Sequence, residues 1–338
     1  MKSFPAKATI WAMALTLSVT ATYACLHLAP TYKGAVGQNT QEAVLIHHNG
    51  REELVLGVKY EIEGSESAEK LAWVITVPNE PDAYNVADPK LFEEMFDFSR
   101  KLTPQPKSNT LGPIALGVQP AGVELGKSAA VGPYDIQPVR GVGPDALQGL
   151  NDWMTKNGFS AFKASEMAYF VENKFTFLAV KINPAKNKKE VGKNGSLPPL
   201  HLSFATDRPY YPLRLSSGQG VFDLNLHILT KEKIDFSSDT NKEILDRLKH
   251  TNPMLPQNKT ISRTAAPKTL QAVFNKSSTM KGITGDWHYT NLSGIGLNEQ
   301  NSISAWKTDI FFGDVKQSEK RRKGTEKVGT EKVSGTFE

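Results

Sequence analysis

Histidine and aspartate are the side chains in this 338-residue chain whose spacing could support catalysis or metal binding. Asp223, Asn225 and His227 alternate with two leucines, so a strand here would place the three polar side chains on one face. With His201 on a neighbouring strand and Asp207 beyond it, this face could hold a metal ion or a general base. The simpler interpretation is a half-exposed antiparallel strand that turns its polar face to solvent.

Other chemical motifs are weaker or absent from the sequence. His47 and His48 are adjacent beside an expected turn, where they would point to opposite faces and could not both bind one ion. The sequence contains no HExxH pattern and no glycine-rich phosphate loop, and the residues around Ser217 lack the GxSxG spacing. We therefore assign no catalytic residue, no cofactor and no metal ligand, and the four His and Asp side chains remain weak candidates.

The first residues have the pattern of an export signal. Lys2 and Lys7 precede an uncharged, mostly apolar run over 8–21, which is too short to span a membrane. Cleavage is expected between Ala24 and Cys25. Two alternatives stay open. The signal could remain as an uncleaved anchor, because the longer stretch 8–32 contains no Asp, Glu, Lys or Arg, or a lipid could be attached to Cys25 as the first residue of a lipoprotein. In each case the destination is the periplasm, the cell envelope or the outside of the cell.

The net charge of +5 comes from the two ends of the chain. Two lysines lie in the expected signal, and the low-complexity residues 316–338 carry seven basic and four acidic side chains. The remaining 25–315 are electrically neutral. A neutral body does not favour binding to nucleic acid, and the single cysteine excludes an intramolecular disulfide. The partner expected is a ligand, an envelope component or another protein.

Hydrophobic periodicity predicts an α+β fold, with mainly antiparallel sheet and two or three inserted helices. Residues 41–63 read as a hairpin that turns at Asn49 and Gly50, a dipeptide favoured in type I′ turns. The alternating pattern of 54–62 predicts a half-buried strand, and 71–77 would add a third strand as a meander. Further strands are expected at 131–139, 175–182, 200–205, 211–215 and 222–229, and helices from Asp88, over 145–157 and over 240–250.

These elements suggest four segments. They are a signal peptide (1–24), an α+β domain (25–250), an extension (251–315) and a disordered basic tail (316–338). The extension would begin with a linker or an extended segment that wraps the domain over 251–268, and would contain a β-hairpin within 284–313. Residues 103–133 are rich in proline and glycine, and they form either a mobile excursion or short strands that the sequence does not resolve.

Several stretches give the chain a resemblance to a family of exported bacterial proteins, domain of unknown function 2330. They include Cys25, the hairpin from Gln41, the strand from Trp73 to Pro78 and the helix start Asp88 to Phe92, and then Tyr134–Ile136, 147–159, 175–181, 197–201 and 211–215. Leu26 departs from the glycine expected after the cysteine. The resemblance implies export and a domain outline over about 25–235, and it implies no catalytic residue because the family has no established activity.

Two classes of function follow. We favour a non-catalytic exported protein that binds a ligand, an envelope component or a partner protein through its sheet and residues 103–133. The alternative is a hydrolase whose site would combine the four candidates His201, Asp207, Asp223 and His227. A shared metal site would require the rings of His201 and His227 to lie close together on one sheet face, because metal–ligand bonds are about 2 Å long.

Overall fold

The computed structural model describes residues 26–28, 36–62, 71–102, 123–159, 161–182, 194–218, 221–248, 258–297 and 308–313. Within them the chain is α+β with mostly antiparallel sheet, as the sequence predicts. The expected signal peptide, the basic tail and most of the unassigned stretch, 103–122, lie outside the described residues. The end of that stretch forms two short strands, β6 (Val123–Leu125) and β7 (Ala129–Val131).

The hairpin predicted at Asn49 and Gly50 is confirmed and lies in the middle of the larger sheet. Both turn residues have positive φ angles, 48° and 71°, and they join β2 (Val36–His48) to β3 (Arg51–Ile62). This eight-stranded sheet has the order β14-β15-β13-β2-β3-β11-β5, and β10 also pairs with β3. Besides β2 and β3, this sheet contains β5 (Ala83–Val86), β10 (Asn194–Ser196), β11 (Leu200–Ala205), β13 (Phe222–Thr230), β14 (Lys259–Ser262) and β15 (Asp286–Leu297).

A second sheet has six strands and corrects the expected meander. The strand predicted at 71–77 forms as β4 (Leu71–Val77), but it pairs with β1 (Leu26–Leu28) and β9 (Thr176–Ile182) and not with β3. The edges of β3 are occupied by β2 and by β10 and β11, so the chain continues into the other sheet. This sheet has the order β1-β4-β9-β8-β6, with β8 at Tyr134–Gly141 and β7 paired to it.

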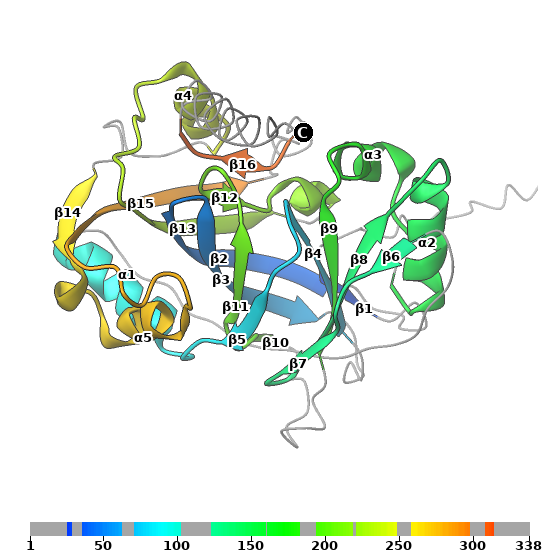
Figure 1. Ribbon diagram of the computed structural model, residues 1–338, viewed down its shortest axis with the longest axis horizontal. Coiled ribbons are helices and arrows are strands. Elements are labelled where there is room, and N and C mark those ends of the chain that lie inside the picture. The colour runs from blue at the N-terminus through cyan, green and yellow to red at the C-terminus, as the bar shows by residue number, and fades with distance from the viewer. Residues whose placement is uncertain are drawn as a thin grey trace, which may run out of the picture.

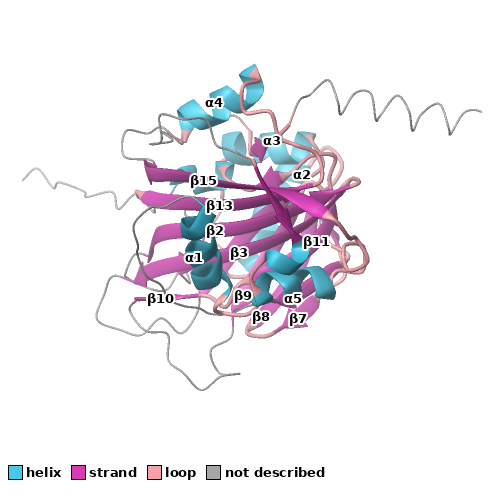
Figure 2. Cartoon of the chain, turned by 90° about the vertical axis from the view of Figure 1, so that its left-hand side faces the viewer, coloured by secondary structure: helices cyan, strands magenta, loops and turns pink. Residues whose placement is uncertain are grey.

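Helices cover the outer faces of the two sheets, which gives four layers. Helices α2 (Ala146–Lys156) and α3 (Ala164–Glu172) lie outside the six-stranded sheet, on the right of Figure 1. Helices α1 (Leu91–Leu102) and α5 (Lys268–Lys276) lie over the outer face of the eight-stranded sheet, as Figure 2 shows. Helix α4 (Asp239–Arg247) and 3₁₀ turns at Arg214–Gly218 and Arg263–Ala265 complete the described helices. The sequence predicted α1, α2 and α4 but missed α3 and α5.

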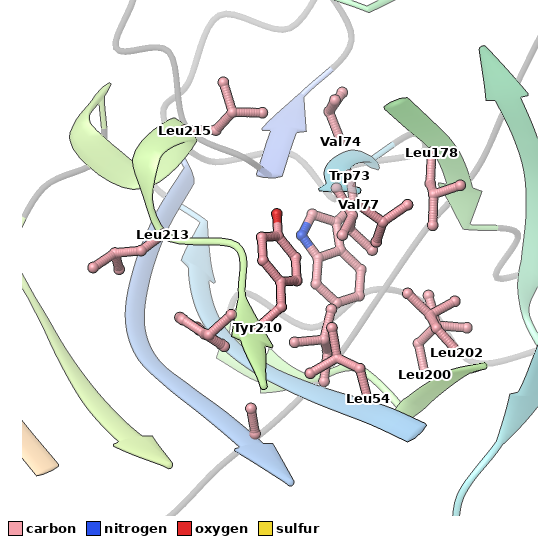
Figure 3. Close-up of a cluster of buried hydrophobic side chains, with 14 of the residues drawn as sticks. Leu54, Trp73, Val74, Val77, Leu178, Leu200, Leu202, Tyr210, Leu213 and Leu215 are labelled. Atoms are coloured by element: carbon pink, nitrogen blue, oxygen red, sulfur yellow. The ribbon is translucent and has the colours of Figure 1, made fainter. Parts of the chain in front are cut away.

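The main core lies between the sheets and continues under α2 and α3. Figure 3 shows part of it, where side chains from both sheets gather: Leu54, Leu200 and Leu202 with Trp73, Val77 and Leu178. A second cluster fills the space between the eight-stranded sheet and helices α1 and α5. The prediction that β3 is half-buried is therefore wrong, because both of its faces are covered and Leu54 and Val55 are each fully buried.

Two strands near the C-terminus pair with strands from earlier in the chain. Strand β15 pairs with β13 and β14, and β16 (Ile310–Phe311) pairs with β12 (Tyr210–Tyr211). The hairpin expected within 284–313 is replaced by these pairings. The expected linker over 251–268 includes β14 and the beginning of α5. Tyr211–Leu215, predicted as a strand, is only briefly extended before the 3₁₀ turn that begins at Arg214.

Helix α1 approaches β3 closely at Gly57, and this contact gives a test of the layer arrangement. A Cβ atom at Gly57 would lie 2.4 Å from Cε2 of Phe92, a buried side chain of α1. We expect Gly57→Ala to lower the free energy of unfolding by about 1–3 kcal/mol through overpacking, measured by urea denaturation. Gly282→Ala is the control, because its Cβ would meet nothing within 4 Å. Equal stabilities for the two variants would contradict this packing.

Candidate functional site

His201 and His227, which the sequence suggested might share a site, lie on the same face of the eight-stranded sheet but far apart. His201 on β11 aligns with Val55, Val55 with Val44, and Val44 with His227 on β13. Two whole strands therefore separate the histidines. At about 4.8 Å between neighbouring strands, their backbones lie about 14 Å apart. The structure does not bring these two rings to one metal ion.

His201 belongs to a buried network centred on Glu53. Its Nε2 lies 2.7 Å from Oε2 of Glu53, and both side chains are essentially inaccessible. The hydroxyl groups of Ser203 and Ser277 donate to the other carboxylate oxygen, Oε1. Among the described residues, Nδ1 of His201 has no hydrogen-bond partner.

The composition of this network resembles a Ser-His-acid triad, but its connectivity does not. In a triad the imidazole bridges the hydroxyl and the carboxylate, so that it can take the hydroxyl proton. Here the carboxylate of Glu53 is the hub, and both serine hydroxyls bind it directly. No serine in the network is activated by His201. The arrangement satisfies a buried carboxylate, which would be costly to leave without hydrogen bonds.

His227 is fully buried, so the interpretation of a strand with a solvent-facing polar side is wrong at this position. Strand β13 lies between β2 and β15, under the second hydrophobic cluster. Nδ1 of His227 lies 2.8 Å from the hydroxyl of Tyr289, and Nε2 lies 3.2 Å from Nδ2 of Asn225. Burial lowers the pKa of His227 to about 3, so the ring is neutral at physiological pH.

The two aspartates lie at opposite ends of the sheet. Asp223, near the start of β13, is exposed and accepts a hydrogen bond from the backbone N–H of Gly296 at 2.9 Å. Asp207 follows β11 and lines a cavity beside the β2–β3 turn. The four residues considered for a hydrolase are thus distributed over separate places. Within the described ranges, no group of three His, Cys, Asp or Glu side chains could hold a metal ion.

The cavity beside the turn has a volume of about 90 Å³. Its wall is formed by the turn (47–49), the loop that contains Asp207 (207–209), the end of β13 with the residues after it (230–235), and 312–313. His47, which forms part of this wall, is held by a hydrogen bond between Nε2 and the carbonyl of Thr206 at 2.9 Å. Four segments distant in sequence thus meet at one end of the sheet.

A second buried carboxylate, Asp309, joins the C-terminal strand to the core. Its Oδ1 accepts hydrogen bonds from the backbone N–H groups of Leu213 and Arg214, at 2.9 and 2.6 Å. Its Oδ2 lies 2.7 Å from the hydroxyl of Tyr210, which also lies 2.8 Å from the carbonyl of Thr76. The hydroxyl of Tyr210 has one proton and cannot donate to both oxygens. If it donates to the carbonyl of Thr76, a proton on Asp309 could form the second hydrogen bond, to the Tyr210 oxygen. Burial raises the pKa of Asp309 to about 6.

The sequence did not predict the buried carboxylates of Glu53 and Asp309. It also did not predict that Thr230 lines the cavity. Charged residues next to a turn are typical of an exposed hairpin end, so Glu53 gave no sign of burial. Asp309 lies within an aromatic stretch expected to form a hairpin, and nothing in the sequence connects it to Tyr210. Helix α5 did leave a signal, because Leu270, Val273 and Phe274 follow helical spacing after Pro267.

None of the described helices is long and apolar enough to cross a membrane.

The structure defines a four-layer α+β protein with buried polar networks and a cavity at one sheet end. The model for a family of uncharacterized proteins conserved in bacteria (DUF2330) matches residues 19–257, and the chain belongs to that family. No curated protein matches. Among solved structures, the chain is similar to the crystal structure of baculovirus P35, with a TM-score of 0.42 and 8% identity over 86% of this chain and 100% of the other.

The raised pKa of Asp309 predicts a pH dependence of stability. The folded pKa of about 6 lies above the ordinary 3.8, so the folded state binds the proton more tightly than the unfolded chain. The stabilisation from this proton is complete below the unfolded pKa and is lost as the pH rises through the folded pKa. Between about pH 4 and about pH 7, we expect Asp309→Asn to gain up to about 3 kcal/mol in unfolding free energy relative to the parent chain.

Urea denaturation of both proteins at the two pH values measures this difference. The lowered pKa of His227 gives the opposite slope, because its stabilising contribution is lost as the pH falls. That contribution is common to both proteins and cancels when they are compared. A difference in stability that does not change with pH would contradict the protonation of Asp309.

Proposed function

We propose that this chain is an exported bacterial protein that binds a ligand, an envelope component or a partner protein and catalyses no reaction. The observation that carries the proposal is the separation of its candidate catalytic groups. His201 and His227 are buried in different hydrogen-bond networks, and Asp207 and Asp223 lie at opposite ends of the sheet. A cavity at the turn offers a place for binding that needs none of these groups to act together.

Export is supported by the sequence. Two lysines, an apolar run over 8–21 and a small residue at Ala24 have the order of a cleavable signal. The mature protein would then begin at Cys25 in the periplasm, the cell envelope or the medium. Membrane attachment would arise only through an uncleaved signal or a lipid on Cys25. The neutral charge of the body supports a partner other than nucleic acid.

No observation favours the hydrolase alternative. Hydrolysis requires a nucleophile, or an activated water, within hydrogen-bond reach of a base. The two serines in the His201 network, Ser203 and Ser277, donate hydrogen bonds to Glu53. The two ring nitrogens of His227 lie within hydrogen-bond distance of Tyr289 and Asn225. We therefore keep binding as the proposed activity.

Mass spectrometry of the protein recovered after bacterial expression tests export. We expect a mature chain that begins at Cys25 without modification, found outside the cytoplasm. The control is Cys25→Ser, which should be processed in the same way because simple cleavage needs only a small residue after Ala24. A chain that retains residue 1 would contradict cleavage. A diacylglycerol adduct on Cys25, lost in the serine variant, would make the protein an anchored lipoprotein.

A further inference from the structure

Arg214 is a cation that has no carboxylate partner among the residues that the structure describes. It begins the 3₁₀ turn Arg214–Gly218, and its guanidinium carbon lies 4.9 Å from the centre of the Tyr169 ring and 5.8 Å from that of Phe170. Both rings belong to α3. Its Nη2 also donates to the carbonyl of Ser165 at 3.2 Å, in the first turn of the same helix. Two rings and one hydrogen bond therefore hold this guanidinium in place without neutralising its charge.

The stacked guanidinium of Arg214 keeps hydrogen-bond donors available at its edge. A guanidinium is planar, and rings that cover its face leave its N–H groups pointing outward in its own plane. Nε and Nη1 of Arg214 make no hydrogen bond to any described residue, and neither is a buried atom. Parallel N–H groups on one edge of a guanidinium match the paired oxygens of a carboxylate or a phosphate.

The hydroxyl of Tyr169 is a second donor beside this guanidinium. Tyr169 is half-buried, and its hydroxyl is neither buried nor hydrogen-bonded to any described residue. Burial raises the pKa of Tyr169 to about 12, although the nearby charges of Arg214 and Arg208 favour the ionised form. The hydroxyl therefore keeps its proton at physiological pH and can donate it to an anion.

Positive charge predominates around the Tyr169 hydroxyl. Arg208 is the second cation that acts on it, and its guanidinium lies 5.1 Å from the centre of the Phe311 ring. The opposing charge is Asp309, which is fully buried and is bound by two backbone N–H groups and a tyrosine hydroxyl. Two guanidinium groups and one buried carboxylate leave a net attraction for an anion at the surface.

We propose that Arg214 and Tyr169 form a binding site for an oxyanion, a carboxylate or phosphate group of a small ligand. The guanidinium edge of Arg214 binds two oxygens of the group, and the Tyr169 hydroxyl donates to one of them. Arg208 contributes its charge, and no contact with the ligand is assigned to it. This inference rests on the proposed binding function and names the chemistry of a ligand. Its site lies apart from the cavity beside the β2–β3 turn, which neither Arg214 nor Tyr169 lines.

Isothermal titration calorimetry of the purified full chain tests the inference, with inorganic phosphate and acetate as separate probes. The ionic strength is held constant with sodium chloride, so that screening does not change during the titration. We expect saturable binding of at least one probe, and the stronger one identifies the group as a phosphate or a carboxylate. Arg214→Gln should weaken this binding at least about tenfold, because it removes charge-assisted hydrogen bonds.

Two further variants separate the contacts. Arg214→Lys keeps the charge but loses the planar pair of donors, so it should also bind more weakly than the parent. Tyr169→Phe keeps the ring under Arg214 and removes only the hydroxyl, and should weaken binding about fivefold. Because that hydroxyl has no described partner, Tyr169→Phe should keep the parent stability in urea denaturation, and a weaker affinity then cannot be attributed to unfolding.

The matched control is Arg100→Gln. The guanidinium of Arg100 also lies over an aromatic ring, 5.7 Å from the centre of Phe96, but it already has a carboxylate partner in Asp97 at 3.8 Å. The substitution removes the same charge from the protein as Arg214→Gln. We expect this control to retain the parent affinity for both probes.

The outcomes separate this site from the proposed function. Absence of saturable binding for both probes, or equal weakening in Arg100→Gln, would overturn the site, since the second result would show attraction by net charge alone. Parent affinity in Arg214→Lys would contradict the paired contact, and parent affinity in Tyr169→Phe would contradict the role of the hydroxyl. All of these results would leave export and binding at the cavity standing, whereas a chain that retains residue 1 would contradict export without bearing on Arg214.

Discussion

Two adjacent carboxylates on β3, Glu52 and Glu53, are both fully buried, and the rest of the structure must satisfy them. Neighbouring residues in a strand point to opposite faces, so hydrogen-bond donors are needed on both faces of the sheet. The carboxylate of Glu53 is hydrogen-bonded by the side chains of His201, Ser203 and Ser277. On the other face Oε2 of Glu52 accepts from the backbone N–H of Tyr210 at 2.7 Å, and Oε1 has no hydrogen-bond partner among the described residues. Burial raises the pKa of Glu52 well above its usual value.

This constraint joins parts of the chain that are distant in sequence. Ser277 follows α5 directly, so the bond to Glu53 ties that helix to the sheet. Tyr210, held by Glu52, also contacts Asp309 just before β16. The family match ends at residue 257, yet Glu52 and Glu53 lie within it and depend directly or indirectly on residues beyond it. The C-terminal strands and α5 are therefore part of the same folded core.

Local signals in the sequence were enough for the hairpin at Asn49 and Gly50 and for helices α1 and α2, because turn chemistry and helical spacing act over a few residues. The partner of each strand was not predictable, since β4 would show the same apolar pattern beside β3 or in a second sheet. The geometry of the candidate site was not predictable for a related reason. His201 and His227 have suitable chemistry, but β2 and β3 lie between their strands in the sheet. The burial of Glu53 depends on helices α1 and α5, which cover this face from distant parts of the chain.

The most direct test of this account is a double-mutant cycle between Glu53 and Ser277, read from unfolding free energies. We expect Glu53→Ala and Ser277→Ala to be coupled by about 1–3 kcal/mol, because each removes the same buried, charge-assisted hydrogen bond. The exposed pair Glu243 and Arg247, four residues apart on α4, gives the comparison and should couple by only about 0.3–0.5 kcal/mol. If the two buried substitutions add independently, Glu53 does not hold the C-terminal segment to the sheet.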